Sequence, residues 1–301
     1  MLLPPLSVVD VVGGDAAKIL SNLTTNNLEP LASASPDSCE GVETFVTNVK
    51  GRCLGHVMAY PIENGIRLVG ARGQSEAIVS QIDRYTIRED ATPTIRDSDF
   101  SATLDPDPPG CVFQCEVPWL GDQPTTLSLV SDHDGADQDT SDVDGEHADE
   151  SMLTDPFHRE RIMNLFPWFG VDVTDSNLPQ EAGRDSKVIS FTKGCYLGQE
   201  TVARLDARGR VQKMLTRVQL TGLPEAISLE QLRSIKLLPA GEGEMPKQAM
   251  RLTSVSLGDP TWAIAMTRRS HFDAGSRGTA HVDGCDINAT VMPPEMADQQ
   301  S

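Results

Sequence analysis

The first hundred residues alternate between short apolar runs, which predict strands, and amphipathic stretches, which predict helices. β-rich runs are expected to form strands at 8–12, 42–49, 53–60 and 66–68. Asn64-Gly65, between the last two runs, is the strongest short-range signal for a β-hairpin, because both residues accept the positive φ angles of a tight turn. These runs together predict a mostly antiparallel sheet.

Two amphipathic helices are expected beside this sheet, with Asp15 and Ser75 placed to cap them. Their apolar faces recur at helical spacing, at Ala17, Leu20 and Leu23 in the first and at Ile78, Val79, Ile82 and Tyr85 in the second. This α-β-β-β-α order suits helices packed on one face of an antiparallel sheet. The predicted fold class is therefore α+β.

The rest of the chain is less regular. Residues 101–157 are rich in Pro and Asp and contain one recognisable strand at 126–130, followed by a helix near 158–164. A strand is expected at 188–191, and a helix is expected to begin at Gln199. Short β runs separated by Gly and Pro predict a small C-terminal barrel, with strands at 218–220, 250–257, 262–266 and 279–282.

We predict three parts on this basis: an α+β region of two lobes at 1–212, the barrel at 213–290 and a disordered tail at 291–301. Residues 132–150 carry nine carboxylates and no Lys or Arg. Such a stretch cannot bury enough apolar surface to offset the entropy of ordering it. A disordered acidic insertion is therefore expected at about 131–151, in preference to a calcium loop.

Composition limits the partners and the compartment. The formal net charge of -19 argues against duplex DNA as a partner, because duplex binding depends on neutralising phosphates. No apolar run approaches the ~20 residues that span a bilayer, so no membrane partner is expected. Six dispersed cysteines in 301 residues do not form a disulfide framework, which predicts a reducing, cytoplasmic compartment. Cys111 and Cys115 lack a second Cys pair, and no metal site is predicted.

The signature run, Lys193-Gly194-Cys195-Tyr196-Leu197-Gly198-Gln199-Glu200, carries the strongest chemical signal. A nearby cation lowers the pKa of a cysteine and favours the nucleophilic thiolate, and glycines allow close approach of a ligand to the backbone. From Arg184 to Arg217 there are eight basic residues and three acidic ones. The pattern predicts an anion-binding pocket with a reactive thiol, the alternative being a cysteine that merely packs in a Gly-rich turn.

Residues 191–204 closely resemble the signature of the YgfZ family of folate-binding proteins. These are relatives of the glycine-cleavage aminomethyltransferase (T-protein), implicated in iron–sulfur cluster assembly or repair and in tRNA modification. Other stretches resemble the same family in the same order: 14–27, the Lys50-Gly51-Arg52 hairpin, Leu178-Pro179-Gln180-Glu181, and 262–269. The resemblance implies an aminomethyltransferase-like fold, with two ferredoxin-like lobes and a C-terminal barrel around a folate cleft.

The resemblance also implies a site. Cys195 is expected to be the functional thiol, and iron–sulfur proteins or their assembly machinery are the expected partners. A tetrahydrofolate-type small molecule is the expected ligand. The residues expected to bind it are Lys193, Tyr196, Gln199, Glu200, Arg204, Asn26 and Lys50.

Two positions depart from the family pattern. The Asp pair of T-proteins, which handles the reacting folate nitrogen, falls at Gly55 and His56, so ordinary aminomethyl transfer is disfavoured and His56 is either a proton carrier or a structural residue. Met163 stands where relatives commonly have a Glu that pairs with pterin N–H donors. Because Met cannot accept these hydrogen bonds, the unpaired pterin donors are expected to weaken folate binding by roughly 1–3 kcal/mol. Three functions stay open: a YgfZ-type accessory protein, a folate-dependent one-carbon transferase, and a scaffold that has lost the pterin site.

Overall fold

The computed structural model describes residues 1, 3–121, 123–131, 152–209, 211–239 and 247–293. The acidic insertion was expected at about 131–151 and the tail at 291–301. Residues 132–151 and 294–301 lie outside the described ranges, whereas Ser131 and Val291 are each the last residue of a strand. The described residues form two compact units. The first comprises 1–117, 124–131 and 168–209, and the second comprises 118–123, 152–167 and 211–293. Residues 118–123 and 152–167 thus group with the barrel, although they precede residue 212 in the chain.

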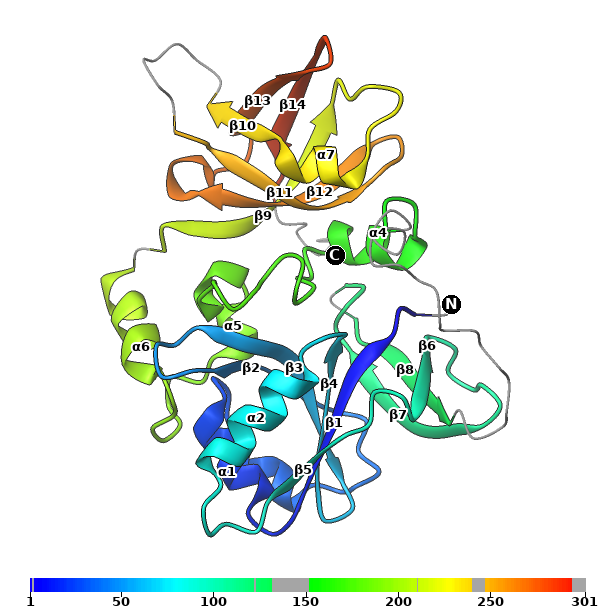
Figure 1. The fold of residues 1–301 in the computed structure, drawn as a ribbon, viewed down its shortest axis with the longest axis vertical. Helices are drawn as coiled ribbons and strands as arrows, with labels where there is room; N and C mark the ends of the chain where they lie inside the picture. The colour runs from blue at the N-terminus through cyan, green and yellow to red at the C-terminus, as the bar shows by residue number, and fades with distance from the viewer. Residues whose placement is uncertain (2, 122, 132–151, 210, 240–246, 294–301) are drawn as a thin grey trace, which may run out of the picture. The chain divides into compact units, whose positions relative to one another are not determined.

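The first unit is built on a five-stranded antiparallel sheet with the order β2-β3-β4-β1-β5 (Figure 1). Its strands are β1 (Leu6–Val12), β2 (Val42–Thr47), β3 (Cys53–Ile62), β4 (Gly65–Ala71) and β5 (Thr92–Ile95). Helices α1 (Ala16–Leu23) and α2 (Ser75–Tyr85) pack side by side on this sheet and close one apolar core with it. The expected α-β-β-β-α order and hairpin turns are therefore confirmed.

The helix caps differ from the sequence prediction. Asp15 occupies the expected N-cap position of α1, but its carboxylate accepts a hydrogen bond from the Asp90 backbone N–H at 3.0 Å and makes no capping bond to the helix. Ser75 is the first residue inside α2 rather than its N-cap, and its hydroxyl donates to Asp97 at 2.7 Å. The N-cap position belongs to Gln74. Long-range partners have taken both side chains away from local capping.

The 3-stranded sheet of the first unit was largely missed by the sequence analysis. It has the order β6-β8-β7, and only β8 was expected. Its strands are β6 (Phe100–Thr103), β7 (Cys111–Val117) and β8 (Thr125–Ser131). A register shift between Cys111 and Phe113 breaks the alternation of β7, and β6 is short, so neither strand shows a clear period of two.

The strand expected at 188–191 is wrong. Residues Asp185–Val188 form the short helix α5, and the next residues are irregular. Thr25 and Asn26 explain the difference, because their side chains donate to the carbonyls of Val188 and Lys187 at 2.6 and 2.9 Å. These carbonyls are thus held by side chains instead of a strand partner. The remaining elements of this unit are η1 (Glu29–Ser33), η2 (Pro179–Ala182) and α6 (Gln199–Arg208).

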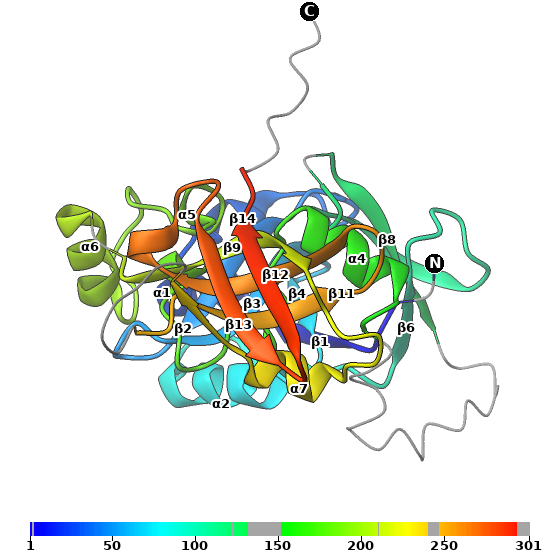
Figure 2. The same ribbon diagram turned by 90° about the horizontal axis from the view of Figure 1, so that it is seen from above.

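The second unit is a closed six-stranded barrel with the order β10-β11-β12-β9-β14-β13 (Figures 1 and 2). Its strands are β9 (Lys213–Thr221), β10 (Lys236–Pro239), β11 (Met250–Ser256), β12 (Thr261–Arg268), β13 (Arg277–Val282) and β14 (Cys285–Val291). Helices α4 (Pro156–Met163) and α7 (Leu229–Ser234) and the turn η3 (Arg269–His271) accompany them. The α+β class and the C-terminal barrel are therefore confirmed.

Helix α4 is fastened to the barrel by a buried arginine. Asp155 caps the helix by accepting from the Phe157 N–H at 2.7 Å. Arg161 donates to His158 Nδ1 at 2.7 Å and to the Ser254 hydroxyl on β11 at 2.8 Å. Burial, with the neighbouring Arg161 charge, lowers the pKa of His158 to about 3, so its ring stays neutral and accepts this bond. Nowhere in the described ranges is a helix long and apolar enough to cross a membrane.

Candidate functional site

The signature run lies across the C-terminal end of helix α1. The backbone N–H of Ser190 donates to the Thr25 carbonyl at 3.0 Å, and that of Leu197 donates to the Asn22 carbonyl at 2.8 Å. Cys195 lies between these two attachments and is exposed. The run therefore presents its thiol on a segment that is fixed before and after it.

Lys193 is held by the same helix end. Its ammonium donates to three backbone carbonyls, those of Ser21, Thr24 and Asn26, at 2.5, 2.8 and 2.6 Å. The ammonium also lies 4.9 Å from the centre of the Tyr196 ring. Burial lowers the pKa of Lys193 to about 8. The three hydrogen bonds of the ammonium thus go to backbone carbonyls, which offers an alternative to the anion-binding role expected from the sequence.

The other end of the run is locked by two glycines that face each other. Gly51, in the β2–β3 hairpin, and Gly198, before helix α6, have φ angles of 71° and 82°. A Cβ on Gly198 would lie 2.5 Å from both the Asn48 carbonyl oxygen and the Gly51 Cα. Only glycine combines this positive φ with so close a backbone approach. The contact joins the Lys50-Gly51-Arg52 hairpin to the signature run and explains why both motifs contain glycine.

Cys195 lines a hollow of about 330 Å³ in the first unit, here called the Cys195 hollow. Ile19 and Leu23 of α1, Tyr85 of α2, and Tyr196 and Leu197 of the run provide most of its surface, with Asn22 and Glu89 as polar members. Hydrogen bonds from the backbone N–H groups of Arg88 and Ile87 lower the pKa of Glu89 to about 2. The hollow is thus mainly apolar, with one fixed negative charge.

The exposure of Cys195 contrasts with that of two other thiols in the unit. Cys53 and Cys115 are fully buried. Burial raises the pKa of Cys53 well above its ordinary value and that of Cys115 to about 12. Because the thiolate is the nucleophile and the metal ligand, these two thiols are inert at neutral pH. Cys195 is available to a second protein or to a small reagent.

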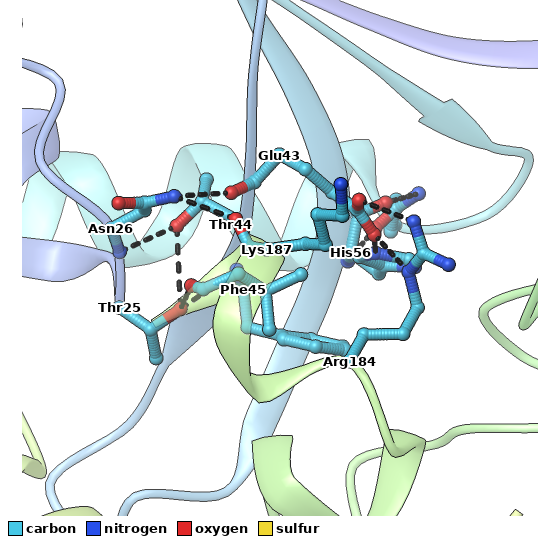
Figure 3. A network of polar contacts seen from close by, with 10 residues as sticks. Thr25, Asn26, Glu43, Thr44, Phe45, His56, Arg184 and Lys187 are labelled. Atoms are coloured by element: carbon cyan, nitrogen blue, oxygen red, sulfur yellow. Dashed lines mark hydrogen bonds and ion pairs between the residues drawn. The ribbon is translucent and has the colours of Figure 1, made fainter. Parts of the chain in front are cut away.

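A buried ionic network lies next to the run, on strands β2 and β3 (Figure 3). Glu43 receives two bonds from the Arg184 guanidinium at 2.6 Å each, and it pairs with His56 Nε2 at 2.8 Å. The His56 ring stacks on Phe45, with ring centroids 4.4 Å apart. Although burial opposes ionisation, the bonds from His56 and Arg184 lower the pKa of Glu43 to about 2. Glu43 is therefore a buried anion that pairs with the half-buried guanidinium of Arg184.

Glu43 is the residue that sequence reasoning missed. Residues 48–62 contain no carboxylate, yet antiparallel pairing places Phe45 opposite His56 and brings Glu43 within reach from the neighbouring strand. The only signal in the sequence was the predicted pairing of 42–49 with 53–60. His56 is 5% exposed and bonded to Glu43, contacts that are typical of a structural histidine.

Asn26 extends this network to helix α5. Its amide nitrogen donates to the carbonyls of Glu43 and Lys187 at 3.0 and 2.9 Å (Figure 3). Its amide oxygen accepts from the Asn27 N–H at 2.9 Å. The side chain expected to bind folate therefore joins β2 to α5. Together with Arg184, it holds the segment that leads into the signature run.

The expected site residues lie in two places: at the end of helix α1, and where the β2–β3 hairpin meets the start of helix α6. Tyr196 is buried beside Cys195, and burial raises its pKa to about 12. Lys50 at the hairpin tip and Glu200 and Arg204 on α6 are exposed, and Gln199 is half-buried at the start of that helix. The Gly51–Gly198 contact brings the hairpin and the start of α6 together. Asn26 and Lys193 instead lie at the end of α1.

The second unit contains Met163, one of the two places where the sequence departs from the YgfZ pattern. Met163 is half-buried at the end of α4, and its carbonyl accepts a hydrogen bond from Arg217. The amide nitrogen of Asn164 donates to the carbonyls of Leu120 and Glu160 at 2.7 and 2.9 Å. Among the described residues, no three Cys, His, Asp or Glu side chains are grouped so as to hold a metal ion.

Asp185, beside Arg184 in α5, is predicted to weaken the first unit at neutral pH. Its Oδ1 is buried and makes no hydrogen bond among the described residues. Burial and the Asp206 carboxylate raise its pKa to about 6, from 3.8. Because the folded pKa is raised, the folded state binds this proton more tightly. The stabilisation is therefore complete below pH 3.8 and is lost as the pH rises through 6.

Asp185→Asn should therefore raise the melting temperature at pH 7.5, by about 2 °C. The gain should shrink as the pH is lowered from 6 towards 3.8, where the wild-type carboxyl becomes neutral. Scanning calorimetry across this range measures the effect. Asp83→Asn, at an exposed position in α2, is the matched control, and an equal gain from it would refute the assignment to Asp185.

No family model matches the sequence. The curated proteins that are similar to it include two from different organisms. The iron–sulfur cluster assembly factor IBA57 of Homo sapiens, mitochondrial, is 27% identical over 234 residues, covering 69% of this chain and 63% of that protein. The mitochondrial IBA57 homolog of Neurospora crassa is 25% identical over 236 residues, covering 69% and 50%. The chain thus spans between half and two thirds of the length of these relatives.

A solved structure has the same fold. The glycine cleavage system aminomethyltransferase T from Bartonella henselae superposes with a TM-score of 0.70 at 14% identity, covering 97% of this chain and 84% of that one. The expected aminomethyltransferase-like fold is therefore confirmed. At 14% identity, this match shows that the fold is shared and shows no other property of the chain.

Proposed function

We propose that this chain, a YgfZ/IBA57-like protein with the aminomethyltransferase T fold, supports iron–sulfur cluster assembly or repair through the thiol of Cys195. The observation that carries the proposal is the exposed Cys195, which lines a mainly apolar hollow and lies between two residues bonded to helix α1, Lys193 to the Ser21 carbonyl and Leu197 to the Asn22 carbonyl. Similarity to proteins named iron–sulfur cluster assembly factors supports the same reading.

The chemistry of a single thiol limits what this site can do. Thiolates are the ligands that iron–sulfur clusters prefer, and a cluster is commonly held by four of them. Cys195 supplies one such ligand, so a partner protein must supply the others. The site is therefore suited to a passing contact with a cluster or with a partner's cysteine.

The proposal predicts that Cys195→Ala abolishes function without unfolding the protein. In cells that lack their own relative of this chain, the wild type should restore the activity of a [4Fe–4S] enzyme, and the Ala variant should leave it at the empty-vector level. Cys39→Ala, which removes another exposed thiol, should restore activity fully. Full restoration by Cys195→Ala at equal protein level would refute the proposed role of this thiol.

A tetrahydrofolate-type ligand forms the second part of the proposal. Asn26 and Lys193 are bonded to backbone carbonyls of the first unit. Lys50 and Arg204 are exposed cations, and an arginine can bind a carboxylate through two parallel hydrogen bonds. The described residues of the first unit thus fit the anionic glutamyl tail of a folate better than its pterin ring.

Binding of tetrahydrofolate should accordingly be weak and sensitive to salt, because exposed charge contacts are screened over about 8–10 Å at physiological ionic strength. Arg204→Gln should weaken binding by about fivefold, or roughly 1 kcal/mol. Arg72→Gln, at another exposed arginine, should leave it unchanged. Calorimetric titration at two salt concentrations measures both effects. Tight binding that changes neither with salt nor in Arg204→Gln would contradict binding through the glutamyl tail.

A further inference from the structure

Lys193 is bonded in a way that the proposed function does not use. Its ammonium has three N–H donors, and each of the Ser21, Thr24 and Asn26 carbonyls lies within 2.8 Å of the nitrogen. Ser21 belongs to the last turn of α1, and Thr24 is the C-cap of that helix. The last carbonyls of a helix have no partner within it and carry partial negative charge. Lys193 supplies both the donors and the charge that this end requires.

The same helix turn forms one wall of the Cys195 hollow. Ile19, Asn22 and Leu23 of α1 line the hollow together with Cys195, and the Asn22 carbonyl accepts from the Leu197 N–H at 2.8 Å. Cys195 is thus two residues after one attachment to α1, the Lys193 ammonium, and two residues before the other, the Leu197 N–H. The position of the thiol relative to the hollow depends on these two attachments.

We propose that Lys193 is the positioning residue of the Cys195 site: its ammonium ties the signature run to the end of helix α1 and so sets the thiol on the rim of the hollow. This inference concerns the site named in the proposed function, but its geometry stands without that function. It replaces the expectation that Lys193 binds an anionic ligand or activates the thiol by charge alone.

The geometry distinguishes lysine from arginine. An ammonium directs three donors to three carbonyls that converge on one point, whereas a guanidinium directs its donors outward in a plane. A charge effect on Cys195 would survive Lys193→Arg, and the tie to the three carbonyls would not. Lys187, an exposed lysine in α5, provides a matched control for the loss of one positive charge.

Hydrogen exchange of the purified chain provides the test. In Lys193→Met and in Lys193→Arg, protection of the Leu197 N–H should fall about tenfold relative to the wild type. Lys187→Met should leave it unchanged, and the amides of barrel strands β11 and β12 should keep their protection in every variant. Unchanged protection in Lys193→Met, or full restoration by Lys193→Arg, would overturn the proposal. If Lys193→Met does not fold, Lys193→Gln is measured against the same criteria.

Alkylation of Cys195 by iodoacetamide, relative to Cys39 in the same sample, gives a second readout. If the three hydrogen bonds of Lys193 position the thiol, Lys193→Met and Lys193→Arg should both change the ratio of the Cys195 rate to the Cys39 rate, and by the same amount. A rate that falls in Lys193→Met and returns to the wild-type value in Lys193→Arg would identify a charge effect instead and overturn the proposal. Both readouts use the isolated protein, so their failure leaves the role of Cys195 in cells untouched. Likewise, full activity of Cys195→Ala in cells would leave the tie untouched.

Discussion

Glu43→Gln is expected to destabilise the first unit by about 3 kcal/mol, the cost of removing one partner from a buried ion pair. Its carboxylate is bonded to both Arg184 and His56, and its side chain is 6% exposed. A neutral amide cannot balance the charge of Arg184, whose side chain is only 17% exposed in the wild type. Arg184 stands at the start of α5, so the loss should also loosen the segment that leads into the signature run.

Urea denaturation followed by far-UV circular dichroism measures the change, with hydrogen exchange assigning it to the first unit. Glu63→Gln is the matched control, because Glu63 is exposed in the turn between β3 and β4 and surface substitutions usually change stability by less than about 0.5 kcal/mol. Equal stabilities for Glu43→Gln and Glu63→Gln would show that the network contributes little.

Gly198→Ala is expected to be nearly as damaging, at about 3 kcal/mol, for a steric reason. The added methyl group would lie 2.5 Å from the Asn48 oxygen, and the φ angle of 82° disfavours any residue with a Cβ. Either the β2–β3 hairpin or the start of α6 must move. Because the hairpin supports the signature run, activity in cells should fall as well.

Gly194→Ala offers a control within the same run. A Cβ on Gly194 would meet no heavy atom within 4 Å, and its φ angle is not positive. This substitution should change the melting temperature by less than about 2 °C, equivalent to a few tenths of a kcal/mol. Equal effects of the two alanines would mean that the backbone contact at Gly51 is not what requires a glycine.

Local sequence patterns predicted much of the fold. The Asn64-Gly65 turn, the apolar faces of α1 and α2, and the short β runs of the barrel are visible over a few residues, and each was found in the structure. Strand β7 was missed because the register shift after Cys111 interrupts its alternation. Helix α5 was mistaken for a strand because its partners, Thr25 and Asn26, lie about 160 residues earlier in the chain.

The site shows the same limit. Cys195 could be proposed from the sequence because the residues of its motif are contiguous. The partner of His56 could not be, because Glu43 reaches it only across a strand pair. The hydrogen bonds of Lys193 could not be predicted either, because their acceptors are backbone carbonyls, which every residue has. Long-range polar contacts of this kind require the folded chain.

Reconstitution of an iron–sulfur apo-enzyme by purified assembly machinery tests the role of Cys195 most directly. Enzyme activity reports cluster loading, with and without this chain. The wild type and Cys39→Ala should raise the yield of active enzyme to the same extent, and Cys195→Ala should give only the yield obtained without the chain. A Cys195→Ala variant that raises the yield as much as the wild type would contradict the account.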